Sequence, residues 1–161
     1  MDLSAKTPCG GLLERDNVCL VRILGTEWKP GQAEDILQKF ADQKISLSYL
    51  IIEHESDEDC NMSLCVNRED LGRSTALLTE IRKTLGPSKV VSLDSVVILT
   101  LYGPHFMEKP ALASRALSSL FKAGIKPHSL SSSINSISLV VGAMDHAGTV
   151  ASLSRMFDWP E

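Results

Sequence analysis

The sequence predicts an α+β protein built from two similar halves, and three observations carry this prediction. Residues 18–66 and 96–141 show the same succession of apolar strand, proline-opened helix and further strands. In each half an isoleucine follows the helix-opening proline by fifteen positions, as Ile45 follows Pro30 and Ile125 follows Pro110. The third strands also match, because NMSLCV in the first half corresponds to SISLVV in the second. We therefore interpret the chain as an internal duplication.

The first half has the order βαββαβ, which is the ferredoxin-like plan. Its apolar and β-branched runs predict strands, and Pro30 suits the first turn of a helix because no N–H partner is needed there. Gly86 stops the second helix. The predicted strands cover residues 17–24, 45–52, 60–66 and 89–93, and the predicted helices cover residues 30–43 and 70–85.

The second half has the order βαββα and lacks a fourth strand. It begins with a strand at residues 96–102 and ends with a helix at about residues 145–158. A ferredoxin-like sheet without its fourth strand would leave an unpaired edge. We expect residues 9–13 to supply that strand, so that the N-terminal segment completes the second sheet. The expected domains are therefore residues 14–94, and residues 95–161 together with 8–13.

Composition limits the classes of partner. The net charge is −4, which argues against nucleic acid because phosphate binding depends on Lys and Arg. No apolar run reaches the length of a membrane span, and the N-terminus lacks a charged-then-apolar signal. We expect a cytoplasmic protein with neither a nucleic-acid nor a membrane partner.

The residue types that most often act in catalysis or metal binding lie far apart in the sequence or in strand patterns. The four cysteines show no CxxC spacing, and Cys19 and Cys65 lie inside strand patterns as packing residues. The serines near the end of the second half fit small polar strand positions, because no His–acid pair lies at a recognisable spacing. The histidines His54, His105, His128 and His146 lie far apart in the sequence. We expect no catalysis, no metal and no cofactor.

Two stretches resemble a known family. GTEWKPGQAEDIL at residues 25–37 resembles the loop Gly-x-x-Asp-x-Pro-Gly-x-Ala of the first ACT domain of aspartate kinases, and GIKPHSLSSSINSISLVV at residues 124–141 resembles their second ACT domain. The resemblance covers about residues 17–157, without a kinase domain. It implies two ACT units packed side by side, a homodimer, and an amino acid such as lysine or threonine bound at an interface between units.

The resemblance also implies a ligand site at the turn into the first helix. That turn offers N–H groups and the positive end of a helix dipole to a ligand carboxylate, and Gly31 allows close approach of the backbone. The loop Asp of the family is replaced by Trp28, and the Asn after Gly-Ile is replaced by Lys126. Glu27 or Glu53 is then a candidate partner for the ligand ammonium. The implied ligand-binding residues are Trp28, Lys29, Gly31, Gln32 and Ala33, with Lys126, Pro127 and His128 from the facing unit.

Three functions follow from this interpretation. The first is a non-catalytic regulatory protein that binds an amino acid or a related metabolite and changes a partner's conformation. The second is a ligand-free interaction module that docks on an enzyme of amino-acid metabolism and regulates it. The third, an enzyme built on the same sheet, has the least support. A ligand screen separates the first from the second, because a bound ligand stabilises the folded state.

Overall fold

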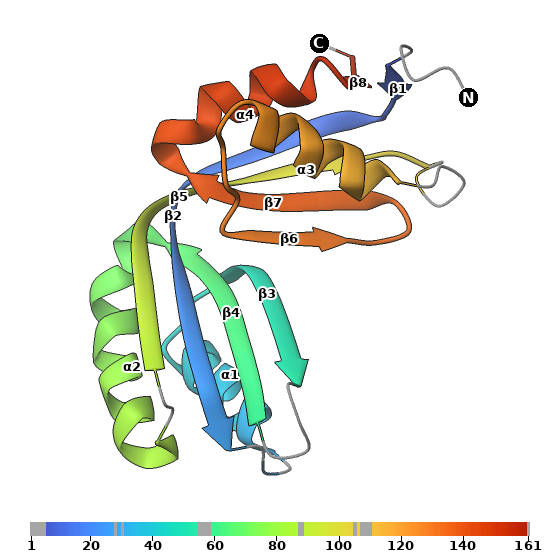
Figure 1. Cartoon of the computed structure of the whole chain (residues 1–161). Helices are drawn as coiled ribbons and strands as arrows, with labels where there is room; N and C mark the ends of the chain where they lie inside the picture. Colours follow the sequence, from blue (N-terminus) through green and yellow to red (C-terminus); the bar gives the residue numbers. More distant parts are fainter. Residues whose placement is uncertain are drawn as a thin grey trace. The chain divides into compact units, whose positions relative to one another are not determined.

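The computed structural model describes residues 6–27, 29, 31–54, 59–86, 89–104, 106 and 111–160 (Figure 1). The chain divides into two compact units. The N-terminal unit is Asn17–Ser95, and the C-terminal unit combines Met1–Asp16 with Val96–Glu161. The division falls inside two long strands, β2 (Gly11–Glu27) and β5 (Lys89–Tyr102), so each of these strands contributes to both units.

The N-terminal unit has the predicted βαββαβ order. In the described residues its strands follow the order β3-β4-β2-β5, which is the strand order of a ferredoxin-like sheet. β4 lies antiparallel to both β2 and β3, and the β2–β4 register pairs Leu20 with Cys65. The further elements of this unit are α1 (Gln32–Asp42), β3 (Leu47–His54), β4 (Asp59–Asn67), a short 3-10 helix (Arg68–Asp70) and α2 (Leu71–Leu85).

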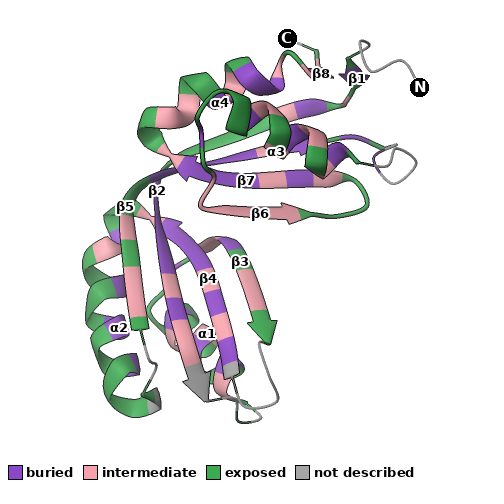
Figure 2. Cartoon of the chain, viewed as in Figure 1, coloured by how far each residue is buried: buried purple, intermediate pink, exposed green. Residues whose placement is uncertain are grey.

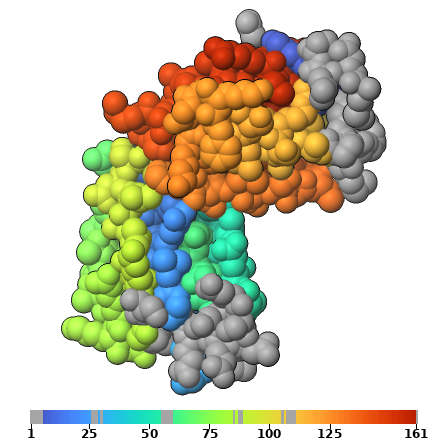
Figure 3. Space-filling view, in the orientation of Figure 1, coloured from blue at the N-terminus to red at the C-terminus, as the bar shows by residue number. Residues whose placement is uncertain are grey.

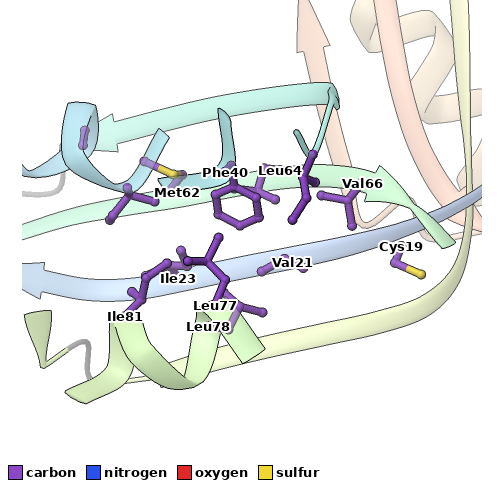
Figure 4. Packing of buried hydrophobic residues seen from close by; sticks show 13 residues of the cluster. Cys19, Val21, Ile23, Phe40, Met62, Leu64, Val66, Leu77, Leu78 and Ile81 are labelled. Carbon is purple, nitrogen blue, oxygen red and sulfur yellow. The ribbon is translucent and has the colours of Figure 1, made fainter. Parts of the chain in front are cut away.

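Apolar residues at strand and helix spacing form the core of this unit. Alternate residues of β2, such as Val21 and Ile23, belong to one buried cluster with Phe40 of α1 and Ile81 of α2 (Figure 4). Phe40 has no exposed surface. Both helices therefore cover one face of the sheet, as the amphipathic pattern of α1 requires.

The C-terminal unit contains the second ferredoxin-like sheet. Its strands follow the order β2-β5-β7-β6, and both β5 and β6 lie antiparallel to β7. The start of β2 is the fourth strand, next to β5, where the Gly10 N–H donates to the Tyr102 carbonyl at 2.7 Å. The prediction that the N-terminal segment completes this sheet is confirmed. The further elements are α3 (Leu112–Lys122), β6 (Ser129–Ser132), β7 (Ser136–Gly142), a 3-10 helix (Ala143–Asp145) and α4 (His146–Leu153).

The two ends of the chain meet in the C-terminal unit. β1 (Thr7–Pro8) pairs in parallel with β8 (Phe157–Asp158). The Thr7 N–H donates to the Met156 carbonyl and the Cys9 N–H to the Asp158 carbonyl, both at 2.8 Å. Arg115 of α3 adds a hydrogen bond from Nη1 to the Thr7 hydroxyl at 3.0 Å. Phe157 packs in the core of this unit beside Phe106, with 6.4 Å between the ring centroids. Figure 2 shows the buried and exposed positions of these elements.

The duplication is visible at the helix ends. α1 and α3 each end in a left-handed residue, Lys44 with φ 54° and Gly124 with φ 75°. In both cases the N–H of the following isoleucine donates to a carbonyl five residues earlier, from Ile45 to Phe40 at 3.0 Å and from Ile125 to Leu120 at 2.9 Å. This is the Schellman arrangement, in which a left-handed residue ends the helix and an apolar contact follows.

Several predicted boundaries are wrong. Residues 9–13 and 17–24 were expected as separate strands, but most of both belongs to β2, and residues 89–93 and 96–102 are joined in β5. Neither join contains a glycine or proline, and both strands continue through it, although Asn17 at the join within β2 is left-handed with φ 56°. The strand predicted at residues 45–52 begins at Leu47, because Ile45 caps α1. The helix predicted to residue 158 ends at Leu153. The helix-opening Pro30 and Pro110 lie outside the described residues.

Candidate functional site

The turn before α1 has a defined backbone geometry. Gly31, at the N-cap, is left-handed with φ 89°. The Gln32 N–H donates to the Lys29 carbonyl at 3.0 Å, and the Lys29 N–H donates to the side-chain oxygen of Gln32 at 3.1 Å. The Asp35 N–H then donates to the Gly31 carbonyl at 2.8 Å and begins the regular helix. This reciprocal pair fixes the entry of the chain into α1.

The same turn has the features of an anion site. Helix geometry leaves the N–H groups of Ala33 and Glu34 without an intrahelical acceptor, at the positive end of the dipole. A side chain added at Gly31 would meet no described atom within 4 Å, so the described residues leave space beside this turn. The exposed Lys29 adds a positive charge nearby. A carboxylate can therefore approach the backbone here.

Two acidic residues oppose such an anion. Glu34 and Asp35 are exposed in the first turn of α1. Their carboxylates already complement the helix dipole, and they repel a second negative charge at the same end. The sequence interpretation missed this effect, although the residues are plain in the stretch GQAED. The charges at this helix end are therefore mixed, with Lys29 on one side and two carboxylates on the other.

The second predicted group lies in the C-terminal unit, before β6. Lys126 is exposed, whereas Pro127 and His128 are half-buried. The His128 N–H donates to the Val140 carbonyl at 2.7 Å, and Pro127 has no N–H. This stretch can therefore offer side chains and carbonyls to a ligand, but no backbone donor from these two residues.

The predicted site residues thus fall into two groups, each described in its own unit. Lys29, Gly31, Gln32 and Ala33 come together in one turn. Trp28 lies outside the described residues, as does the side chain of Glu27. Glu53, the other candidate for the ligand ammonium, is exposed near the end of β3.

The corresponding turn of the second half differs from the first. Ala111 stands where the first half has Gly31, and it is also left-handed, with φ 66°. The first turn of α3 contains no acidic residue. Arg115 stands where α1 has Asp35. The duplicated halves have therefore kept the backbone turn and changed its charge.

Several serines of the C-terminal unit make hydrogen bonds within the sheet and its β6–β7 turn. The Ser138 hydroxyl lies 2.9 Å from the Thr100 hydroxyl on the neighbouring strand. In the β6–β7 turn the Ser133 hydroxyl lies 2.8 Å from that of Ser136, and the Ser133 N–H donates to the Ser136 carbonyl at 2.8 Å. These contacts are structural, as the strand interpretation of the serines expected.

The buried thiols are poor nucleophiles. Burial raises the pKa of Cys65 to about 12, and a smaller effect from the neighbouring Cys19 acts in the same direction. Burial also raises the pKa of Cys19 and of Cys60. Because the thiolate is the reactive form, these three residues are protonated and inert at neutral pH. The described part of the chain contains no group of three side chains suited to hold a metal, and none of its helices is long and apolar enough to cross a bilayer.

No protein-family model and no curated protein matches the sequence. The fold does match solved structures. The aspartokinase alpha and beta subunits are 21% identical with a TM-score of 0.81, and the alignment covers 92% of this chain and 97% of that chain. The ligand-free regulatory subunit of aspartate kinase from Thermus thermophilus is 14% identical with a TM-score of 0.81, over 93% and 99% of the two chains.

A third match is Escherichia coli aspartokinase III, solved in complex with lysine and aspartate in its T-state. It is 17% identical with a TM-score of 0.67, over 93% of this chain and 33% of that chain. At these identities the likeness shows a shared fold. The resemblance to the tandem ACT regulatory part of aspartate kinases, without the kinase domain, is confirmed at this level.

Proposed function

We propose that this chain is a non-catalytic regulatory protein that binds an amino acid or a related small metabolite at the turn into α1. The observation that carries the proposal is the open, left-handed Gly31 turn, which presents the N–H groups of Ala33 and Glu34. The fold supports it, because solved structures of the same fold include regulatory subunits of aspartate kinase and an aspartokinase with bound lysine.

The ligand chemistry follows from the charges around the turn. A carboxylate would accept hydrogen bonds from the helix N-terminus, with Lys29 beside it. The ammonium would be attracted by Glu34 and Asp35, the exposed carboxylates of the first turn. We propose Trp28, Gln32, Lys126, Pro127 and His128 as further residues of the site, as the family pattern implies. Regulation then requires that the ligand bind two arrangements of the protein with different affinity.

A second candidate is a ligand-free module that docks on an enzyme of amino-acid metabolism. The observation that favours it is the acidic first turn of α1, because Glu34 and Asp35 already satisfy the helix dipole. The substitution of the family's loop Asp by Trp28 also favours it. In this case the fold serves as a scaffold for protein contacts, and no small molecule is needed.

A thermal-shift screen with the common amino acids separates the two candidates. A ligand present at one hundred times its dissociation constant adds about 2.7 kcal/mol of stability. For a protein of this size that corresponds to a rise in Tm of roughly 5–10 °C. No shift with any amino acid would overturn amino-acid binding and favour the docking candidate.

A matched pair of variants locates the site. Gly31 and Gly86 are both left-handed, and a Cβ at either would meet no described atom within 4 Å. Gly31→Ala and Gly86→Ala should therefore cost similar stability, about 1 kcal/mol each. Only Gly31→Ala places a methyl group beside the proposed ligand. A tenfold or greater loss of ligand affinity in Gly31→Ala, with none in Gly86→Ala, is expected. Equal affinities would place the ligand elsewhere.

A further inference from the structure

The duplication makes the helix pair of one unit a reference for the helix pair of the other. The N-terminal unit has the pair α1 and α2, and the C-terminal unit has the pair α3 and α4. Aligning Pro30 with Pro110 matches α1 with α3. Asp70 and Asp145 are the N-cap residues of α2 and α4, each after a 3-10 helix, and aligning them matches these two helices. Positions whose charge differs between the two pairs then show where the halves have diverged.

In the N-terminal unit an ion pair joins the two helices. Nζ of Lys39 on α1 lies 2.5 Å from Oε1 of Glu80 on α2. At the end of α1, Asp42 accepts a hydrogen bond from the side-chain amide of Gln38 at 2.8 Å. The positive charge at this helix seam is therefore compensated within the unit.

The corresponding seam of the C-terminal unit carries different charges. Ser119 corresponds to Lys39 and Arg155 corresponds to Glu80, so a hydroxyl and an arginine replace the ion pair. Lys122 stands where α1 ends in an aspartate. Both Lys122 and Arg155 are exposed. The seam thus has two cations and, among the described residues that line it, no carboxylate.

Two adjoining hollows lie along this seam. The wider hollow, of about 720 Å³, is lined by Ser114, Leu117, Ser118, Phe121 and Lys122. The smaller hollow, of about 120 Å³, is lined by Ser118, Ser119, Lys122, Ser152, Arg155 and Met156. They share two of these residues, and together we call them the α3–α4 groove. α3 and α4 lie on the face of the C-terminal unit that is seen in Figure 3.

Apolar side chains line both hollows. Phe121 is 59% exposed, whereas its counterpart in α1 is the small Ala41. Leu117 is half-buried in the wider hollow, and Met156, in the smaller one, packs against the core of the unit. An exposed ring beside two uncompensated cations favours a partner that brings both apolar groups and carboxylates.

The charge and the exposure of the groove distinguish between classes of partner. Anionic membranes are bound by clusters of about four to eight Lys and Arg, whereas the described lining of the groove has two cations on a chain of net charge −4. A small molecule is normally enclosed on most of its surface, but Phe121, Lys122 and Arg155 all face solvent. A groove between two helices instead suits the apolar face of a third helix.

We propose that the α3–α4 groove binds an acidic amphipathic helix of a partner protein. Apolar side chains of that helix pack on Leu117, Phe121 and Met156. Its carboxylates pair with Lys122 and Arg155. α3 has 11 residues and is about 16 Å long, so a helical segment of about twelve residues spans it. The proposal does not depend on amino-acid binding, because no residue of the groove belongs to the proposed ligand site.

Selection from a random peptide library tests the proposal. Peptides of about twelve residues are displayed on phage and selected on the full chain. We expect the selected peptides to combine several Asp or Glu with large apolar residues, and to bind in the micromolar range. Selection on the charge-reversed variant, Lys122→Glu with Arg155→Glu, should instead yield basic peptides.

A matched control has the same change in net charge at another place. Lys83→Glu with Lys89→Glu alters two exposed positions of the N-terminal unit, and selection on this variant should again yield acidic peptides. Circular dichroism shows whether each variant is folded, which the exposure of the substituted side chains leads us to expect.

Fluorescence anisotropy with a selected acidic peptide gives the size of each contribution. The charge-reversed variant should weaken binding about tenfold or more, because carboxylates then face carboxylates. Phe121→Ala should weaken it about tenfold, because it removes the aromatic contact and keeps both cations. The matched control should bind like wild type.

Several results would overturn the proposal. These are a library that yields no micromolar binder, selected peptides without acidic residues, and a charge-reversed variant that binds the acidic peptide like wild type. Binding to phosphatidylserine vesicles that depends on Lys122 and Arg155 would assign the groove to a membrane instead. Self-association that depends on the same two residues would assign it to a second copy of the chain. Any thermal shift with an amino acid should be the same in the charge-reversed variant, so failure of this proposal is distinguishable from failure of the proposed function.

Discussion

The N-terminal strand of the C-terminal unit is held by close packing between a glycine and a tyrosine, which makes it a sensitive point for perturbation. A Cβ added at Gly11 would lie 2.6 Å from the Tyr102 hydroxyl oxygen and 2.8 Å from two carbons of its ring. Real Cβ atoms do not approach other atoms this closely, so Gly11→Ala must displace the ring of Tyr102 or the strand beneath it.

The magnitude follows from what must move. Forcing an extra methyl group into a packed site typically costs about 1–3 kcal/mol. Tyr102 is 40% exposed, so its ring has some freedom to turn away, but doing so separates it from the Gly10–Gly11 backbone. We expect Gly11→Ala to lower the free energy of unfolding by about 1–2 kcal/mol, in the lower part of that range.

A double-mutant cycle in urea isolates the clash. All three of the nearest atoms to the added Cβ belong to the Tyr102 side chain, so Tyr102→Ala removes the entire obstacle. In that background Gly11→Ala should be neutral or stabilising by about 0.5–1 kcal/mol, because alanine loses less backbone freedom in a strand than glycine. The sign of the effect should therefore reverse between the two backgrounds.

An equal effect of Gly11→Ala with and without the Tyr102 side chain would refute the clash. Unchanged stability after deletion of residues 1–15 would be a second contrary result, because the fourth strand of the sheet would then contribute nothing. Unfolding monitored by a probe in the C-terminal unit is needed, since a chain of two units need not unfold in a single step.

Ala111→Gly should raise the free energy of unfolding by about 1 kcal/mol, because Ala111 is held at φ 66°, which glycine adopts without strain, and chemical denaturation measures this. Lys44 is held at φ 54°, so Lys44→Gly should raise the free energy of unfolding by a similar amount, about 1 kcal/mol. A lower free energy of unfolding would show that contacts of the Lys44 side chain stabilise the fold by more than its backbone strain costs. The pKa of Cys65 is raised from 9.0 to about 12 in the folded protein. The protonated thiol therefore contributes fully to the free energy of unfolding below pH 9, and this contribution is lost at about 1.4 kcal/mol per pH unit as the pH rises towards 12. Urea denaturation at pH 8 and pH 10 should show this loss in wild type and less of it in Cys65→Ala.

The architecture could be predicted because the duplication repeats the same signals. The match of Ile45 with Ile125 placed both helices, and the unpaired edge of the second half predicted the role of the N-terminal strand. The capping role of Ile45 was not predicted, because its apolar side chain fits a strand pattern equally well. The joins within β2 and β5 could not be predicted, because the polar residues at 14–16 and 94–95 are typical of loops. Exposed positions at the edge of a sheet tolerate polar side chains, so composition alone does not end a strand.

Long-range pairing explains the remaining errors. The run before Phe157 has helical periodicity, but the segment extends because Phe157 enters the core and its backbone pairs with Thr7. No local pattern contains that information. At the candidate site the family pattern concerns the loop before α1, so it did not take account of the carboxylates of Glu34 and Asp35 in the first turn of the helix.

The C-terminal unit is built from two segments that lie far apart in the sequence, and this has a consequence for synthesis on the ribosome. The N-terminal unit is continuous from Asn17 to Ser95 and can fold as soon as it emerges. The segments at residues 7–8 and 11–16 are made first, yet their partners, the Phe157 segment and β5 respectively, are made later. At about 5–20 residues per second, this early strand waits several seconds with an open edge. Its short length and the charges of Glu14, Arg15 and Asp16 are suited to keep nascent chains from pairing with one another during that interval.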